Sequence, residues 1–214
     1  MQDSTDASHP IRPLASRRQI IAGGTFAIVL ALARDAPAQA APPPLPPQAP
    51  LPATPACHNG DPVTKAQAEG PFYKTASPLR SDLREAGIAG QPIELSGFIL
   101  TRLCRPVAGA FIDLWQANDQ GEYDTQGFHL RGHQFADGKG HFAFRTIVPG
   151  LYQARTRQFH LRVQAAAESP VFTTQLYFPD EPHNQDDDQF RPELVLQMSP
   201  DMQHARFDIV LAMR

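Results

Sequence analysis

Two tyrosines and a histidine stand where turns meet strands, and these residue types can hold a metal ion together. Tyr123 lies in NDQGEYDTQGF, directly after a turn, and Tyr152 follows the Pro149-Gly150 turn. His160 lies on the stretch that comes next. Two phenolates and an imidazole form a hard, anionic donor set that suits Fe(III) better than Zn(II) or Mg(II). The ordinary alternative is that each tyrosine simply packs, half-buried, beside its turn.

The stretch QFHLRV, residues 158–163, alternates in the way typical of a β-strand. Its apolar residues face one way, while Gln158, His160 and Arg162 face the other. This polar face is either solvated, or His160 and Tyr152 hold something between them.

A scaffold of strands must position these side chains, and the sequence after Cys57 supplies one. Short runs rich in β-branched and aromatic residues alternate with turn sequences. Strands are predicted for PIELSGFIL (92–100), AGAFIDLWQA (108–117), HFAFRTI (141–147), FHLRVQA (159–165), VFTTQLYF (171–178) and RFDIVLA (206–212). Long helical patterns are missing between them, so we predict an all-β fold, an antiparallel β-sandwich with a few short helices and long loops.

Two segments depart from the strand pattern. Residues Ser81–Ala86 predict one short helix. Residues 178–194 form a polar, acidic stretch, FPDEPHNQDDDQFRPEL, that could bind a cation. Its run Asp186–Asp188 lacks the glycine and the spaced ligands of a calcium loop, so a solvated loop is the favoured interpretation.

The first 40 residues have the features of an export signal. Arg17 and Arg18 precede an apolar run, residues 20–33, and Ala38-Gln39-Ala40 follows as a small-residue cleavage site. Paired arginines favour twin-arginine export over an ordinary Sec signal. The apolar run is too short to span a bilayer comfortably, which disfavours a membrane anchor. We therefore expect a periplasmic or secreted protein.

The remaining chain divides into a linker and one domain. Residues 41–56, APPPLPPQAPLPATPA, predict a proline-rich tether of extended character, and residues 57–214 predict the folded domain. The net charge of −3 and the pI of about 6.2 argue against nucleic acid and polybasic membrane binding. The sequence leaves open whether the domain forms a homo-oligomer.

Cys57 and Cys104 are the only cysteines. An even pair in an oxidising compartment is more typical of a disulfide than of a metal site. A metal site built on both thiolates would need further ligands, and His58 is the only one at ligand spacing. A disulfide is therefore predicted.

Several motifs resemble the intradiol catechol dioxygenase family, especially its small, secreted bacterial members. AEGPFY at 68–73 resembles the start of the family domain, and SPLRSDLRE resembles the segment after it. GAFIDLWQANDQGEYD is similar to the strand and turn that deliver the first iron tyrosine. RGHQFADGKGHFAFRTIVPGLYQARTR resembles the stretch leading to the second, and TTQLYF and FRPEL also fit. The resemblance covers most of the domain in order.

The resemblance implies non-haem Fe(III) as the cofactor, with Tyr123, Tyr152 and His160 as ligands. The family expects a His-x-His pair on the strand, and here Gln158 replaces the first histidine. Its amide oxygen is a hard but weaker donor than imidazole, so iron binding would be weakened rather than excluded. Gln158 could instead bond a water on the metal. His129 and His133 are disfavoured as replacements, and loss of the metal from a conserved fold stays an alternative.

The implied substrate is a small aromatic diol, whose ring O2 opens between the two hydroxyl-bearing carbons. Arg155 matches the family arginine that stabilises the electron-rich ring, and Gln175 matches a glutamine beside the site. Trp115 is expected in the core. The rival functions are a non-catalytic β-sandwich that binds aromatic or phenolic ligands, and a metal site with altered chemistry such as hydrolysis.

Overall fold

The computed structural model describes Cys57 and residues 62–213, and all of these described residues belong to one compact unit. The predicted export signal, residues 1–40, and the predicted linker, residues 41–56, lie outside the described residues and stay predictions.

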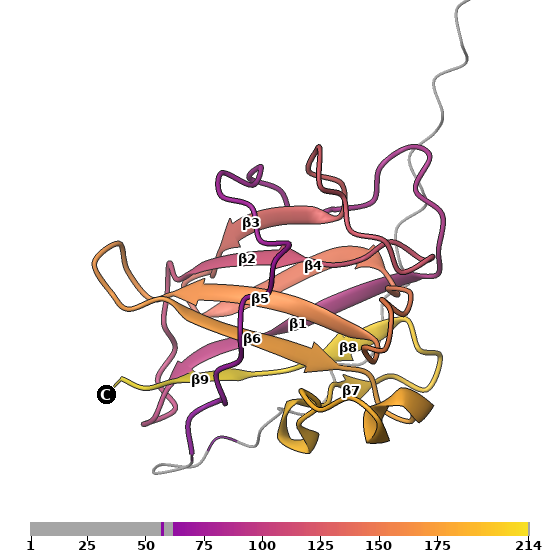
Figure 1. Cartoon of the computed structure of the whole chain (residues 1–214). Helices are drawn as coiled ribbons and strands as arrows, with labels where there is room; N and C mark the ends of the chain where they lie inside the picture. The colour runs from indigo at the N-terminus through magenta and orange to yellow at the C-terminus, as the bar shows by residue number, and fades with distance from the viewer. Residues whose placement is uncertain (1–56, 58–61, 214) are drawn as a thin grey trace, which may run out of the picture. The chain divides into compact units, whose positions relative to one another are not determined.

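One of two sheets has four strands in the order β3-β2-β5-β6, and every neighbouring pair is antiparallel. Its strands are β3 (Arg131–Phe135), β2 (Phe111–Trp115), β5 (Gln158–Gln164) and β6 (Phe172–Tyr177). Figure 1 shows this sheet in front of β1, β8 and β9.

The second sheet has five strands, in the order β4-β1-β8-β7 with β9 also paired to β1. They are β4 (His141–Ile147), β1 (Pro92–Thr101), β8 (His204–Arg206), β7 (Gln197–Met198) and β9 (Ile209–Leu211). β1 is parallel to β8 and β9, while its pairing with β4 is antiparallel. The predicted sandwich is confirmed, with these two parallel pairings as an addition.

The core lies between the sheets, where both contribute alternate apolar side chains. From Ile93 onwards, β1 alternates between buried and half-buried residues, which is the pattern of a strand with one face in the core. Phe142 and Phe144 of β4 meet Phe159 and Leu161 of β5 in the same buried cluster. Because Phe159 and Leu161 point inward, the alternate residues of β5 point to the outer face of the four-stranded sheet.

The helix predicted for Ser81–Ala86 is wrong. The segment runs extended beside β4: Arg145 N donates to Ser81 O at 2.8 Å, and Leu83 N donates to Arg145 O at 2.8 Å. These bonds compete with helical ones, and they bring Leu83 into the core with no exposed surface. Tertiary pairing therefore overrides a weak local preference.

The strand predicted for 206–212 is interrupted. β8 ends at Arg206 and β9 begins at Ile209, because Asp208 turns inward and its Oδ1 accepts from Phe98 N at 3.0 Å. The side chain of Asp208 takes the place of a backbone acceptor between the two short strands.

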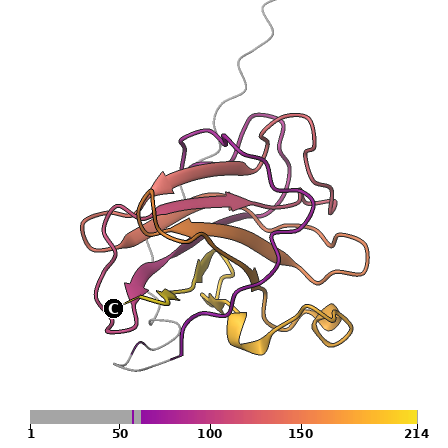
Figure 2. The same ribbon diagram turned by 60° about the vertical axis from the view of Figure 1, so that its left-hand side comes forward.

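The helices among the described residues are two short 3₁₀ turns, η1 (Pro182–Gln185) and η2 (Pro192–Leu194). They lie together beside the end of β6 in Figures 1 and 2. In the part of the chain that the structure describes, no helix is long and apolar enough to cross a membrane.

Residues 62–80 cover the outer face of the four-stranded sheet. Thr64 N donates to Val210 O at 2.9 Å, Gln67 N to Thr173 O at 2.8 Å, and Arg80 N to His133 O at 2.9 Å. The segment therefore runs across β6 and β5 towards β3, as Figures 1 and 2 show. It closes one side of the region that holds the polar face of β5.

Cys57 and Cys104 form the expected disulfide, with Cα atoms 5.7 Å apart and a sequence separation of 47 residues. We expect replacement of both cysteines by serine to lower the free energy of unfolding by about 4 kcal/mol, because the open chain regains loop entropy. Urea unfolding of the oxidised protein and the double variant measures this. Two free thiols, found by mass spectrometry in protein from its native compartment, would contradict the pairing.

Candidate metal centre

β5 places Gln158 and His160 on the covered outer face of the four-stranded sheet. Both side chains are 4% exposed, so the polar face of this strand is not solvated at these positions. His160 pairs in register with Trp115 of β2 on one side and Gln175 of β6 on the other. Gly70 lies above it, since a Cβ on Gly70 would be 3.8 Å from His160 Cε1.

Tyr123 reaches this face through a turn built on Asn118. The Oδ1 atom of Asn118 accepts from the backbone N–H groups of Gln120 and Glu122, each at 2.9 Å. This Asx-type turn reverses the chain after β2. It brings Tyr123 Oη to 2.9 Å from His160 Nε2.

Tyr152 is delivered by a second loop that lies against the first. Gly150 N donates to Asn118 O at 2.7 Å. A Cβ on Gly150 would lie 2.3 Å from Gly121 N, and a Cβ on Gly121 would lie 1.9 Å from Leu151 O. The two loops can approach this closely because both positions lack a side chain. The ring centroid of Tyr152 lies 5.4 Å from that of Tyr123, edge to face.

Phe72 packs against both tyrosines. Its ring stacks on Tyr123 with centroids 4.3 Å apart, and it meets the edge of Tyr152 at 5.1 Å. The buried Arg131 holds this wall in place, because its guanidinium donates to Phe72 O and, at 2.8 Å, to Asp124 O. One side chain thus ties the covering segment to the loop that follows Tyr123.

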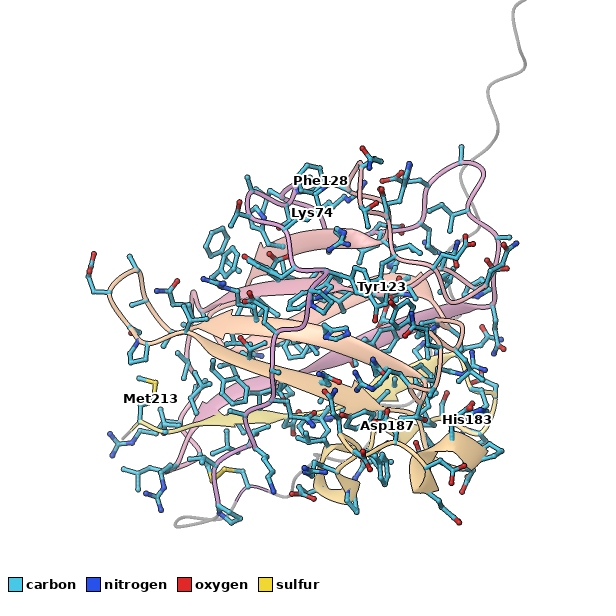
Figure 3. The ribbon with its side chains drawn as sticks, viewed as in Figure 1. Lys74, Tyr123, Phe128, His183, Asp187 and Met213 are labelled. Atoms are coloured by element: carbon cyan, nitrogen blue, oxygen red, sulfur yellow. A yellow bond between two sulfur atoms is a disulfide. The ribbon has the colours of Figure 1, made fainter. Side chains whose placement is uncertain are left out.

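Lys74 fastens the same loop from outside. Its Nζ donates to Gly127 O at 2.6 Å and to Gln126 O at 3.0 Å, and it lies 4.8 Å from the ring centroid of Phe128. Figure 3 shows Lys74 and Phe128 together above β3, with Tyr123 below them. The loop after Tyr123 is therefore held by two positively charged side chains, Arg131 and Lys74.

Burial and nearby arginines set the protonation of the two closest groups. Burial raises the pKa of Tyr123 to about 12, against smaller opposing effects of the Arg155 charge and the Gln158 hydrogen bond. Burial, the Arg155 charge and the Arg131 charge lower the pKa of His160 to about 3. At neutral pH the imidazole is uncharged, and the phenol keeps its proton until a cation replaces it.

Gln158 contributes a buried oxygen that lacks a partner. Its side chain lies close enough to the Tyr123 hydroxyl to lower the pKa of that group, but within Cys57 and residues 62–213 its Oε1 accepts no hydrogen bond. A buried polar atom without a partner is costly, and such atoms often mark a missing ion or water. This oxygen, beside a phenol and a neutral imidazole, fits the donor set that Fe(III) prefers.

Arg155 and Gln175 lie next to this set and contact each other. Arg155 Nη2 donates to Gln175 Oε1 at 2.6 Å, and Gln175 Nε2 donates to Ala68 O at 3.1 Å. Arg155 Nε also donates to Asp187 Oδ2 at 2.8 Å. The positive charge of Arg155 affects the pKa of both Tyr123 and His160.

The structure brings together the predicted site residues: Tyr123, Tyr152, Gln158, His160, Arg155 and Gln175. His129 and His133 make other contacts. His129 Nδ1 lies 2.5 Å from Glu85 Oε2, and His133 Nδ1 lies 3.1 Å from Ser77 Oγ. Among the described residues, no three His, Cys, Asp or Glu side chains are grouped to hold a metal, so tyrosine is essential to this candidate.

Three further residues of the site were missed by sequence reasoning. Trp115 is buried as expected, yet its ring also stacks on His160 with centroids 5.1 Å apart. Phe72 lies in the AEGPFY motif, which by itself predicts no contact with the tyrosines. The interpretation of residues 178–194 as a solvated loop is wrong for Asp187, because its side chain is 2% exposed. Only Trp115 had a usable signal, since a strand residue next to β5 shares its face.

The fold and this arrangement of tyrosines, imidazole and arginine agree with the intradiol dioxygenases that the motifs resemble. The family model described as Dioxygenase matches residues 68–213. The chain belongs to this family, the intradiol dioxygenases that its motifs resemble.

Named relatives and solved structures agree with this assignment. The chain is 32% identical over 144 residues to hydroxyquinol 1,2-dioxygenase of Rhizobium sp. (strain MTP-10005), covering 55% of this chain and 48% of the relative. It is 26% identical over 165 residues to chlorocatechol 1,2-dioxygenase of Rhodococcus opacus, covering 62% and 64%. The chain spans about half the length of the hydroxyquinol dioxygenases it matches.

Among solved structures, the dioxygenase domain of a dioxygenase carbohydrate-binding protein fusion from Streptomyces sp. SirexAA-E matches with a TM-score of 0.67. It is 44% identical, and the match covers 71% of this chain and 99% of that chain. Hydroxyquinol 1,2-dioxygenase from Pseudomonas putida DLL-E4 matches at a TM-score of 0.63 and 24% identity, covering 71% and 67%, and supports the fold alone.

Proposed function

We propose that this chain is an exported, non-haem Fe(III) intradiol dioxygenase. It opens a catechol-type ring between the two hydroxyl-bearing carbons with O2 and yields a muconate-type diacid. The observation that carries this is the buried Gln158 oxygen beside the Tyr123–His160 pair, which has no hydrogen-bond partner in the described part of the chain. The family and the names of the relatives support the reaction class. Arg17, Arg18 and the apolar run after them support export.

Tyr123, Tyr152, His160 and Gln158 would hold the iron. When bound, Fe(III) supplies Lewis acidity that withdraws electron density from a chelated aromatic diolate and makes its ring reactive towards O2. The protein contributes the rest. Phe72 provides an aromatic wall against both tyrosines. Tyr152 would be a phenolate while it holds the metal, and its Oη would accept a hydroxyl proton of the substrate and become a phenol. This Oη accepts from Gln153 Nε2 at 2.9 Å beside an exposed turn.

Arg155 stabilises negative charge on the substrate ring. Its charge already acts on both Tyr123 and His160, so it lies close enough to act on a ring held between them. Gln175 orients it through the 2.6 Å bond.

One observation favours the rival function. Gln158 replaces a family histidine, and this leaves fewer strong ligands for iron. A site that had lost its metal would still offer Phe72, the tyrosines and Arg155 to an aromatic or phenolic ligand.

Iron loading with visible spectroscopy separates the two functions. We expect folded protein given Fe(III) to show a tyrosinate-to-iron charge-transfer band and to convert catechol or hydroxyquinol with uptake of O2. Protein that stays colourless with added iron, and that binds catechol without consuming O2, would establish the binder instead.

Replacing Arg155 by alanine tests its part in the chemistry. We expect kcat to fall by a factor on the order of 10²–10³, the range for loss of one preorganised charge-stabilising donor, with iron content unchanged. Arg102→Ala serves as the control because Arg102 is exposed in the turn after β1. An Arg155→Ala variant that keeps the wild-type kcat would remove Arg155 from the mechanism.

A further inference from the structure

One acidic residue of the run Asp186–Asp188 behaves differently from its neighbours. Asp186 and Asp188 are exposed, whereas the side chain of Asp187 is 2% exposed. The chain turns directly after η1, where Asp187 N donates to His183 O at 3.1 Å, and this turn points the Asp187 side chain inward. Figure 3 shows Asp187 and His183 on this segment, below β6.

The buried carboxylate of Asp187 accepts three hydrogen bonds. Its Oδ2 accepts from Arg155 Nε at 2.8 Å and from Thr156 N at 2.9 Å, while Oδ1 accepts from Gln189 N at 2.9 Å. Burial alone would raise the pKa of Asp187, but the Arg155 bond and the two backbone bonds lower it on balance. Asp187 is therefore ionised at neutral pH, and its charge is paired with Arg155.

The loop that carries Asp187 holds three consecutive residues of the approach to β5. In addition to the bond from Arg155 to Asp187, Thr156 Oγ1 donates a hydrogen bond to Asn184 Oδ1 at 2.6 Å. Arg157 Nε donates to Glu181 Oε1 at 2.9 Å. Residues 181–189 thus form a support beneath the segment between Tyr152 and β5.

Arg155 is oriented by partners on separate elements. Nε is held by Asp187 and Nη2 by Gln175, whose Oε1 also accepts from the Tyr177 hydroxyl at 3.2 Å. Asp187 is the only carboxylate in this set, and a charge-assisted bond is roughly twice as strong as a neutral one. The strongest hydrogen bond of a flexible arginine side chain does most to fix the position of its guanidinium.

We propose that Asp187 is a positioning residue, which fixes the guanidinium of Arg155 at the aromatic-diol site and acts on the reaction only through Arg155. This inference rests on the proposed function for its effect on turnover. The hydrogen bond between Asp187 and Arg155 can be tested without a measurement of turnover.

The test replaces each aspartate of the run by asparagine in the iron-loaded protein. We expect Asp187→Asn to lower kcat by about 10- to 100-fold, the usual range for loss of a supporting hydrogen-bond partner, with iron content unchanged. Asp186→Asn and Asp188→Asn should match the wild type. An unchanged kcat in Asp187→Asn, or an equal loss in all three variants, would overturn the proposal.

A double-mutant cycle separates positioning from general support. In an Arg155→Ala background, Asp187→Asn should cause no further loss of kcat, because the residue through which it acts is gone. If Asp187→Asn lowers kcat by the same factor with and without Arg155, it acts on the fold instead, and the proposal is wrong.

A second measurement uses metal-free protein and needs no activity. The ¹⁵N-labelled wild type should show a slowly exchanging Arg155 Nε–H signal, which disappears in Asp187→Asn and persists in Asp186→Asn. If the wild type has no dioxygenase activity, the proposed function fails, and this signal alone decides the contact. Its persistence in Asp187→Asn overturns the positioning role.

Discussion

Changing Gln158 to histidine is expected to tighten Fe(III) binding by at least about tenfold, within the range that ligand-supporting changes produce. Imidazole nitrogen is a better σ-donor than a neutral amide oxygen. Position 158 lies on the same face of β5 as His160, and its present side chain already reaches the Tyr123 hydroxyl. The tyrosinate band should deepen, and turnover of a catechol should rise.

Iron content after dialysis, the visible spectrum and the rate of O2 uptake measure this effect. Gln164→His is the matched control, because Gln164 lies on the same face at the far end of β5 and bonds the carbonyls of Ala167 and Ser169. If Gln158→His leaves iron content and turnover unchanged, Gln158 does not lie at the metal. If the wild type is already fully loaded and the histidine abolishes activity, the glutamine has a role of its own.

The sequence predicted the strands that carry clear alternation. HFAFRTI coincides with β4, and the alternation of Phe159 and Leu161 with Gln158 and His160 gave the right face of β5. These predictions succeed because a period of two is a property of neighbouring residues in one strand. The short stretch Ser81–Ala86 lacks such a pattern, and its conformation is decided by β4, which is distant in sequence.

The candidate site, too, could be predicted only in part from the sequence. That Tyr123 and Tyr152 belong together came from the family resemblance, because no local rule brings two separate turns to one place. The burial of Asp187 could not be predicted either, since Asp186 and Asp188 have the same residue type in the same run. Its hydrogen bonds to Arg155, Thr156 and Gln189 and its position directly after η1 distinguish it from them.

The contact between the two tyrosine loops depends on Gly150, and Gly150→Ala is expected to disrupt the site severely. The added Cβ would lie 2.3 Å from Gly121 N and 2.5 Å from Asp119 O, and both atoms are backbone. Neither can rotate away, so the loops must separate. Overpacking of this kind costs about 1–3 kcal/mol of the free energy of unfolding. A shift of about 1 Å between reacting groups can lower turnover on the order of 10²-fold.

Gly138→Ala is the control that isolates this close approach. Neither Gly138 nor Gly150 has a positive φ, and a Cβ on Gly138 would meet nothing within 4 Å. Gly138→Ala should therefore keep turnover and leave stability equal or up to about 1 kcal/mol higher, because alanine restricts the unfolded chain. Urea unfolding, iron content and catechol turnover of both variants give the comparison. Equal stability and turnover in Gly150→Ala and Gly138→Ala would mean that Tyr123 and Tyr152 do not depend on this contact for their spacing.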